Sequence, residues 1–218
     1  MLYFHDAKNT FQPLPPLAGL ELRECEDPVV MSALGRISLE EATRRMANDH
    51  KPFVAYFQKK AAAFGWMAMG KAQVGELNHT IILPLYHRYL WNFRTLEEFR
   101  GLGIYPRLLQ YILDDESNRA DCFWILHAPE NKSSEKGILK AGFSFAGHVS
   151  VRNRNEIIFD GAGGNDNFNL LMAESLGFNS SEEPQATCWK CSSPYLADKK
   201  KSCCCEEQGA VCNEEVFH

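Results

Sequence analysis

The chain has 218 residues, of which 45% are hydrophobic and 23% are charged, so it is long enough to bury one core with a small appendage. Its net charge of -5 at pH 7 argues against a protein built around nucleic-acid backbones, which require a concentrated basic face. No apolar run approaches the roughly 18 residues that cross a bilayer, and the N-terminus lacks the basic leader and apolar core of a signal peptide. We therefore expect a cytoplasmic protein with neither a membrane nor a nucleic-acid partner.

The first predicted elements are a strand and a helical region. A strand is expected over residues 17–25, "LAGLELREC", and helical structure over residues 27–50. The helical region carries two start signals, because Asp27 precedes Pro28 and Ser38 stands three residues before Glu41, the spacing of a capping box. The two signals predict that helices begin at Pro28 and just after Ser38.

Aromatic and apolar segments separated by turn residues follow, at residues 51–58, 64–72 and 89–96, and predict consecutive antiparallel strands. Ile104, Leu108 and Ile112 then repeat every four residues and predict a helix with one buried stripe. The remaining predicted elements are a buried strand at 122–128, a short helix at 131–143 closed by Gly142, and a hairpin at 144–155 and 156–161. This order predicts a mixed α/β domain that ends near Asp160.

Two glycines lie directly before the helix that begins near Ile104, in the stretch "RGLGIY". The first turn of a helix has backbone N–H groups without intrahelical partners, and it carries the positive end of the helix dipole. Gly101 and Gly103 would let an anion such as a pyrophosphate approach those donors, and Arg100 would add a cation. The alternative is a strand-to-helix turn in which the glycines only supply an unusual backbone angle.

The stretch "RGLGIY" resembles the acetyl-CoA-binding motif of the GNAT superfamily of N-acetyltransferases, since Arg100 and Gly103 fit and Tyr105 departs from the last position. The stretch "NKSSEKGILKAGF" is similar to the second motif of that family. Its matching positions are Asn131, Ser134, Gly142 and Phe143. The two motifs are joined by a helix and a strand, as in the family, and the resemblance covers roughly residues 18–155.

The resemblance implies a GNAT-like α/β fold: an about seven-stranded, mixed and mostly antiparallel sheet, flanked by helices and splayed between its fourth and fifth strands. Here those strands would be residues 89–96 and 122–128. The acetyl-CoA cosubstrate would lie in the splay, with its pantetheine arm beside the strand backbone and its pyrophosphate on the glycine bend. The cofactor-binding residues implied by the resemblance are Phe93, Arg94, Thr95, Arg100, Gly101, Leu102, Gly103, Ile104, Tyr105, Asn131 and Ser134.

The implied reaction is transfer of an acetyl group to an amine of a small molecule or a protein. Family members commonly place a tyrosine acid seven residues after the asparagine of the second motif, and that position is Ile138 here. His127, at the end of a splayed strand, is the catalytic candidate, with a packed bystander as its alternative reading; Tyr105 is a second candidate. Catalysis by positioning alone also stays open, as does a catalytically silent CoA-binding platform that recruits a partner.

Six of the eight cysteines lie after residue 187, and we expect a domain at 18–160, a linker at 161–187 and a cysteine-rich tail at 188–218. Four thiolates of the tail have spacings that suit structural tetrahedral zinc. They are Cys188, Cys191, Cys203 and Cys205. A disordered tail without metal is the alternative. Cys25 and Cys122, in the body, are expected to be small buried side chains, with a redox pair as the alternative.

Overall fold

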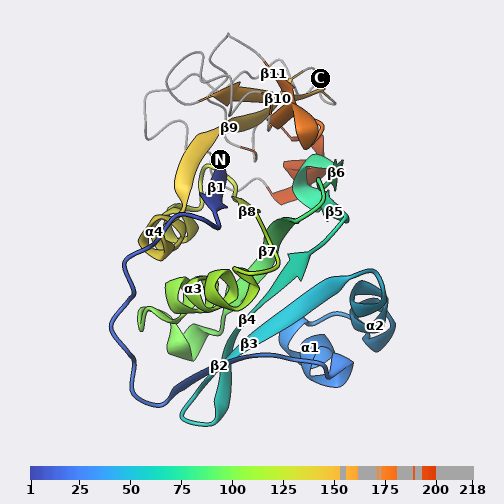
Figure 1. Cartoon of the computed structure of the whole chain (residues 1–218). Coiled ribbons are helices and arrows are strands. Elements are labelled where there is room, and N and C mark those ends of the chain that lie inside the picture. The colour runs from blue at the N-terminus through green and yellow to red at the C-terminus, as the bar shows by residue number, and fades with distance from the viewer. Residues whose placement is uncertain (153–155, 162–170, 172, 181–188, 190–192, 200–218) are drawn as a thin grey trace.

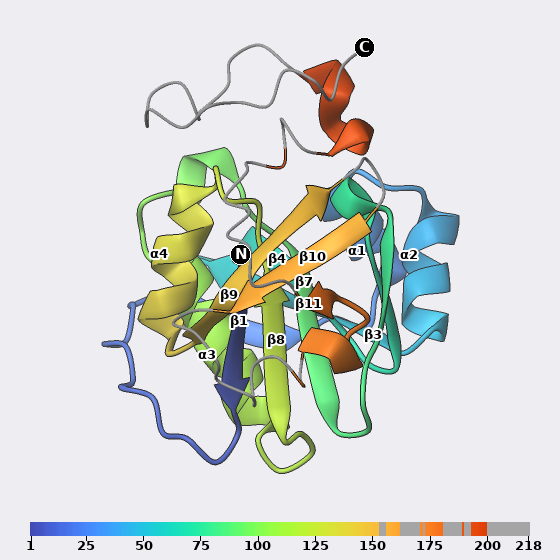
Figure 2. The ribbon, with the colours of Figure 1, turned by 90° about the horizontal axis from the view of Figure 1, so that it is seen from above.

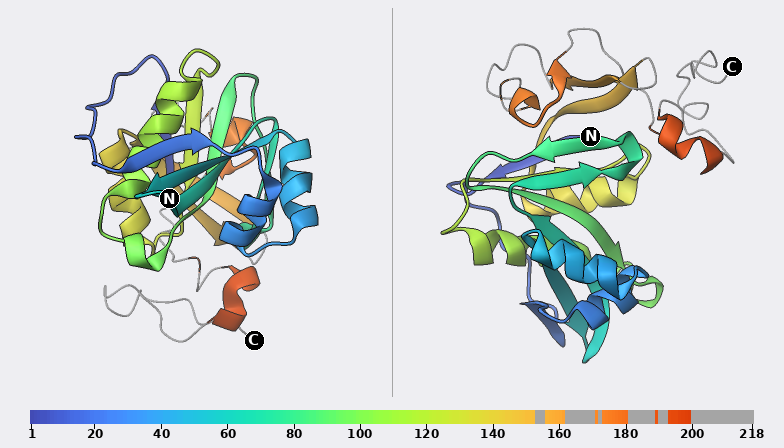
Figure 3. Two further views of the ribbon diagram at one scale, coloured as in Figure 1. Left: turned by 90° about the horizontal axis from the view of Figure 1, so that it is seen from below. Right: turned by 90° about the vertical axis from the view of Figure 1, so that its right-hand side faces the viewer.

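The computed structural model describes residues 1–152, 156–161, 171, 173–180, 189 and 193–199. Its centre is a twisted mixed sheet with helices on both faces (Figure 1). Helices α3 (Ile104–Glu116) and α4 (Lys132–Ala141) cover one face, and α1 (Pro28–Gly35) and α2 (Leu39–Ala47) cover the other, as both panels of Figure 3 show. The predicted fold class, a mostly antiparallel α/β sheet flanked by helices, is confirmed.

The sheet has nine strands in the described part of the chain, where about seven were expected, in the order β11-β10-β9-β1-β8-β7-β4-β3-β2. Neighbouring strands are antiparallel except for the pairs β7–β8 and β10–β11. The strands of this sheet, in chain order, are β1 (Leu2–Asp6), β2 (Leu20–Glu24), β3 (His50–Phe57), β4 (Lys60–Ala68), β7 (His87–Thr95), β8 (Cys122–Leu126), β9 (Ser144–Arg152), β10 (Glu156–Gly161) and β11 (Asn179–Ser180).

Strand β1 was not predicted from the sequence, which placed the first strand at residues 17–25; that segment is β2. The five residues "LYFHD" of β1 lie between β8 and β9 and pair with both (Figure 2). Leu2 and Tyr3 are almost fully buried, so β1 belongs to the core of the sheet. The sheet therefore begins before residue 18, where the sequence suggested that the domain starts.

The predicted helix starts are confirmed. The Asp27 carboxylate accepts a hydrogen bond from the Val29 N–H, with Pro28 at the first helical position, and the Ser38 hydroxyl accepts one from the Glu41 N–H. Helix α4 ends at Gly142, whose φ of 100° is the left-handed conformation expected of a glycine cap. Ile104, Leu108 and Ile112 form the buried stripe of α3 against the sheet.

A β-bulge in β7 sets the divergence of the two central strands. Asn92 and Phe93 together oppose Gly65 of β4, Asn92 has a φ of 53°, and the Phe93 ring occupies the space that a side chain at Gly65 would fill. The parallel pairing of β7 with β8 runs only from His87 to Leu90. From Trp91 to Thr95, the edge of β7 that faces β8 has no strand partner in the described residues, and the predicted splay between these strands is confirmed.

Two further segments complete the described fold. A two-stranded sheet, β5 (Lys71–Val74) with β6 (His79–Ile82), lies between β4 and β7 in the chain, whereas residues 64–72 had been expected to form one strand.

Trp189, in the predicted tail, is buried in the core and donates its indole N–H to the Val149 carbonyl at 2.7 Å. None of the described helices is long and apolar enough to cross a membrane.

Candidate functional site

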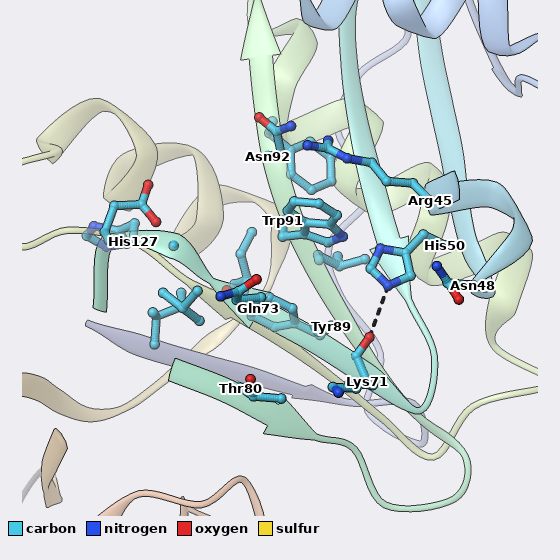
Figure 4. Close-up of a pocket in the computed structure, with 18 of the residues that line it drawn as sticks. Arg45, Asn48, His50, Lys71, Gln73, Thr80, Tyr89, Trp91, Asn92 and His127 are labelled. Carbon is cyan, nitrogen blue, oxygen red and sulfur yellow. Dashed lines mark hydrogen bonds between the residues drawn. The ribbon is translucent and has the colours of Figure 1, made fainter. Parts of the chain in front are cut away.

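A cavity of about 1290 Å³ opens where β7 and β8 diverge, and it has two arms that meet at Trp91 of β7. The first arm lies between the bulge of β7, the end of β8 and the start of α4. The second arm lies between the end of α2, the start of β3 and the β5–β6 hairpin. Figure 4 shows His127 at one side of the cavity and His50 with Arg45 at the other, with Trp91 and Tyr89 between them.

The first arm follows the unpaired edge of β7. Phe93 and Tyr105 line it, and their ring centroids are 5.6 Å apart. A side chain at Gly137 of α4 would collide with the Tyr105 ring, so this tyrosine packs in the groove between the start of α3 and α4. Burial raises the pKa of Tyr105, with hydrogen bonding to Ser134 opposing the shift. Tyr105 is therefore a neutral wall of the arm near pH 7.

The glycine bend leads from the unpaired edge of β7 into α3. Gly101 and Gly103 have φ angles of 82° and 69°, and a side chain at Gly101 would project into open space. Their N–H groups and that of Leu102 have no hydrogen-bond partner in the described part of the chain. Gly103 caps α3 without a side-chain hydrogen bond, so the positive end of the helix dipole is uncovered here. The bend has the geometry of an anion site.

Arg107 holds the bend in place from the first turns of α3. Its Nη1 group donates to the Gly103 carbonyl at 2.8 Å, and its Nε and Nη2 groups donate to the Pro15 carbonyl at 3.0 and 2.8 Å. The arginine thus ties the bend to the segment between β1 and β2. Arg100 lies exposed on the bend, beside Gly101 and Leu102, which are also exposed.

Asn131 caps α4 at the other wall of the first arm. Its Oδ1 atom accepts hydrogen bonds from the Ser134 N–H at 3.1 Å and from the Ser133 hydroxyl at 3.0 Å. The Nδ2 group has no hydrogen-bond partner among the described residues, and Asn131 and Ser134 both line the cavity. The amide N–H groups are thus available to a ligand.

His127 follows β8 and is 6% exposed. Its Nδ1 atom lies 2.8 Å from the Ala128 carbonyl, which can only accept, so Nδ1 carries the proton and Nε2 carries the lone pair. Nε2 has no partner among the described residues, and the ring stacks on Tyr3 with centroids 5.3 Å apart. Burial lowers the pKa of His127 below its ordinary value of 6.5. His127 is therefore a neutral imidazole with a free lone pair beside the cavity.

Trp91 lines the second arm together with Arg45 and His50, two residues that no pattern in the sequence indicates. The Arg45 guanidinium lies 4.6 Å from the centroid of the Trp91 ring, and the His50 ring meets that indole edge-on at 5.3 Å. The Nε2–H of His50 donates to the Lys71 carbonyl at 3.0 Å, the dashed contact of Figure 4. These side chains come from α2, β3, β5 and β7, so no local pattern in the sequence connects them.

The structure brings one group of the predicted site residues together around the first arm and leaves others at its end. Phe93, Tyr105, His127, Asn131 and Ser134 line the cavity. Arg94 and Thr95 continue the unpaired edge of β7, and Ile104 is buried beneath the bend. Ile138, at the position where the family tyrosine was expected, is fully buried in the core.

The predicted zinc ligands Cys188, Cys191, Cys203 and Cys205 lie outside the described residues. Within the described residues, no group of three or more histidine, cysteine or acidic side chains is arranged to hold a metal ion. Cys25 and Cys122 are both buried and have free thiols, which agrees with the prediction that they are small buried side chains.

No family model and no curated protein matches this sequence. Solved structures of similar fold include a GCN5-related N-acetyltransferase from Kribbella flavida, at 11% identity and a TM-score of 0.48, with 66% of this chain and 52% of that chain covered. The ribosomal-protein-S18-alanine N-acetyltransferase from Escherichia coli is 14% identical, with a TM-score of 0.48 and coverage of 62% and 83%.

An acetyl transferase from Salmonella typhimurium, described as modifying the N-terminal serine of ribosomal protein L7/L12, is 19% identical with a TM-score of 0.46 and coverage of 64% and 88%. The present chain thus spans about half of the Kribbella protein and most of the other two.

Proposed function

We propose that this protein is an N-acetyltransferase that moves an acetyl group from acetyl-CoA to an amine. One arrangement supports the proposal: the unpaired edge of β7, where Trp91 to Phe93 line the cavity, continues through a 3-10 turn at Glu97–Phe99 into a glycine bend whose N–H groups have no partner in the described residues. An extended, amide-containing chain that ends in a pyrophosphate matches these two features in that order. The resemblance in sequence to the GNAT motifs agrees with it.

The residues of the first arm fit acetyl-CoA. The backbone of Phe93, Arg94 and Thr95 would pair with the amides of the pantetheine arm, and the Asn131 Nδ2 group would donate to it from the opposite wall. The N–H groups from Gly101 to Tyr105 would hold the pyrophosphate, with Arg100 adding a positive charge. The space beyond Gly101 is open, so the ligand meets no side chain there.

Acetyl-CoA supplies an activated thioester carbonyl when it is bound. The amine nitrogen forms a bond to the carbonyl carbon, the carbon–sulfur bond breaks, the nitrogen loses one proton and the sulfur gains one. His127 is the candidate to take the proton from the amine, because its Nε2 lone pair is free and its proton is fixed on Nδ1. With Ile138 buried in the core, the described part of the chain offers no acid at the position where the family tyrosine was expected, and we propose that His127 or water protonates the sulfur.

Thioester turnover tests this function. Purified full-length protein is mixed with acetyl-CoA and a panel of amines, and the released thiol is measured beside reactions that lack the amine. Thiol release that requires an amine supports the acetyltransferase. Tight CoA binding without turnover across the panel would favour the rival function, a silent CoA-binding platform that recruits a partner.

We further propose that the tail at 188–218 holds one structural zinc ion through Cys188, Cys191, Cys203 and Cys205, in a protein that works in the cytoplasm, where thiols stay reduced. Elemental analysis of protein purified without chelator should find about one zinc per chain. Changing Cys188 and Cys191 to Ser should remove it and leave acetyl-CoA binding intact. Metal-free wild-type protein would contradict this proposal.

A further inference from the structure

Four unpartnered polar atoms gather where the second arm of the cavity meets the sheet. They are Nη1 of Arg45, Nε1 of Trp66, Nε1 of Trp91 and Nδ1 of His50, all buried and without a hydrogen-bond partner in the described residues. A buried donor without a partner costs about 1–3 kcal/mol, so a natural protein seldom retains several in one place without a ligand or water. Arg45, His50 and Trp91 line the cavity, and Trp66 lies directly behind Trp91, with ring centroids 6.3 Å apart.

The guanidinium of Arg45 is held in a fixed orientation. Its Nε group donates to Glu41 at 2.8 Å, and its Cζ atom lies 4.6 Å from the centroid of Trp91 and 5.3 Å from that of Trp66. Ion pairing on one side and stacking on the other leave Nη1 as an unused donor. Arg44 and Arg45 share the one carboxylate of Glu41, so these three side chains together carry one net positive charge.

His50 adds an acceptor to these donors. Its Nε2–H donates to the Lys71 carbonyl, so the lone pair is on Nδ1, the atom without a partner. Burial, and then the charges of Arg45 and Arg44, lower the pKa of His50, while the hydrogen bond to Lys71 and the charge of Asp49 oppose the shift. The ring is therefore neutral at pH 7 and can accept a hydrogen bond.

We propose that the second arm is the acceptor subsite and that it binds a free α-amino acid, whose carboxylate is held by Arg45 and the Trp91 N–H while its amino group points past Trp91 toward the first arm, where His127 lies. The Nη1 group of Arg45 and the Nε1 group of Trp91, one of them cationic, match a carboxylate, and the neutral ring of His50 beside them adds no charge that would repel the amine. This inference rests on the proposed acetyl transfer, since Trp91 lies next to the bulge where the first arm begins.

Binding can be measured without turnover. Protein labelled with ¹⁵N-tryptophan gives one indole N–H signal for each of its four tryptophans, and the Trp91 signal is assigned with Trp91→Phe. The CoA-saturated protein is titrated with each of the twenty L-amino acids and with the matching carboxamides, which keep the amine and lose the negative charge. The Trp91 signal should shift with at least one amino acid, with at least tenfold weaker binding for its carboxamide. Equal binding of both forms, or no shift with any amino acid, would overturn the subsite.

The Arg45→Gln variant supplies the second test, with Arg23→Gln as its matched control. Arg23 also stacks on an aromatic ring, 4.5 Å from the centroid of Tyr56, but lies on the exposed edge strand β2 away from the cavity. Arg45→Gln should abolish the tenfold preference for the carboxylate, and Arg23→Gln should keep it. A preference that survives in a folded Arg45→Gln variant would also contradict the proposal.

The two proposals fail in different ways. A carboxylate-dependent shift without thiol release would leave the amino-acid site standing and refute acetyl transfer, and with it the role of that site as an acceptor subsite. Thiol release from amines regardless of a carboxylate, with no shift of the Trp91 signal, would leave acetyl transfer standing and refute the amino-acid subsite.

Discussion

Buried polar side chains in this protein fall into two groups that differ in their hydrogen bonding. Glu116 of α3 is fully buried, yet its carboxylate contacts Lys51 at 2.8 Å, Arg88 at 3.2 Å and Arg119 at 3.0 Å. His127 is nearly as buried, and its Nε2 atom has no partner among the described residues. A buried polar group with all its hydrogen-bond partners stabilises the fold, whereas a buried polar atom without a partner beside a cavity is a candidate for binding or catalysis.

Glu116 provides a prediction about stability. Burial alone would raise the pKa of Glu116, but the hydrogen bonds and charges of Lys51, Arg88 and Arg119 outweigh it and lower the pKa. Glu116→Gln should therefore reduce the free energy of unfolding by about 3 kcal/mol at pH 7, because it leaves the buried guanidinium of Arg88 without a carboxylate partner.

The sign of the pH effect follows from the lowered pKa. The stabilisation is complete above the carboxyl pKa of the unfolded chain, about 4.3, and is lost as the pH falls through the lower pKa of the folded state. Urea unfolding should show the difference between Glu116→Gln and wild type at pH 7 and a smaller one below pH 4. The control is Asp115→Asn, which removes a partly exposed partner of Arg119 and should lower the free energy of unfolding by less than about 1 kcal/mol. An equal loss in both variants would contradict the role of burial.

His127 provides a prediction about catalysis. If Nε2 takes the amine proton, His127→Gln should lower kcat at least tenfold and leave the acetyl-CoA affinity nearly unchanged. Because burial lowers the pKa of His127, the acidic limb of the wild-type pH-rate profile should lie below pH 6.5 and should be missing in the variant. A pH-rate profile that His127→Gln leaves unaltered would show that His127 only packs against Tyr3.

At the scale of elements, β1 connects the two halves of the sheet next to the cavity. It fills the position between β8 and β9, and the backbone of His127 donates to the Met1 carbonyl at 3.1 Å. Leu2 is fully buried among side chains of the β5–β6 hairpin, β9 and β10. This strand therefore joins the half of the sheet that carries the cavity to the hairpin β9–β10.

Replacement of a single β1 side chain tests that role. Leu2→Ala should lower the free energy of unfolding by about 3 kcal/mol, since it removes a buried side chain and leaves a cavity. Leu39→Ala, at a residue that is 50% exposed on α2, should change it by less than about 1 kcal/mol. Similar urea midpoints for Leu2→Ala and wild type would show that β1 does not belong to the core.

The elements that the sequence predicts correctly are those with local signals. Asp27, Ser38 and Gly142 mark helix ends through their own hydrogen bonds or backbone angle, and the stripe of α3 follows from its period. Strand β1 has only five residues and partners that are more than 110 positions away, so no neighbouring residue reveals it. The start of β5 was merged with β4 because Gly70 was not recognised as a turn, and β6 was not predicted.

The same distinction holds for the candidate site. The glycine bend and Asn131 could be predicted because each lies at a helix start with a recognisable spacing. The second arm could not, because Arg45, His50 and Trp91 come from three elements that only the folded sheet brings together. Arg107 was overlooked because its partner carbonyl at Pro15 is 92 positions away.

At the scale of the whole molecule, the divergence of β7 from β8 produces both arms of the cavity. The bulge at Asn92 turns β7 away from β8, which frees one strand edge on the side of α3 and α4 and places Trp91 against Arg45 of α2 on the other. A cosubstrate and an acceptor can then approach one point of the sheet from opposite arms. The central claim is that the first of these ligands is acetyl-CoA.

Calorimetric titration with acetyl-CoA of the wild type, Gly101→Val and Gly19→Val tests that claim most directly. Both glycines have positive φ angles near 80°, so both variants carry similar backbone strain, but only Gly101 lies on the bend. The wild type and Gly19→Val should bind with equal affinity, and Gly101→Val should bind more than about tenfold more weakly, equivalent to about 1.4 kcal/mol, while remaining folded. Absence of binding by the wild type, or an unchanged affinity in folded Gly101→Val, would contradict the account.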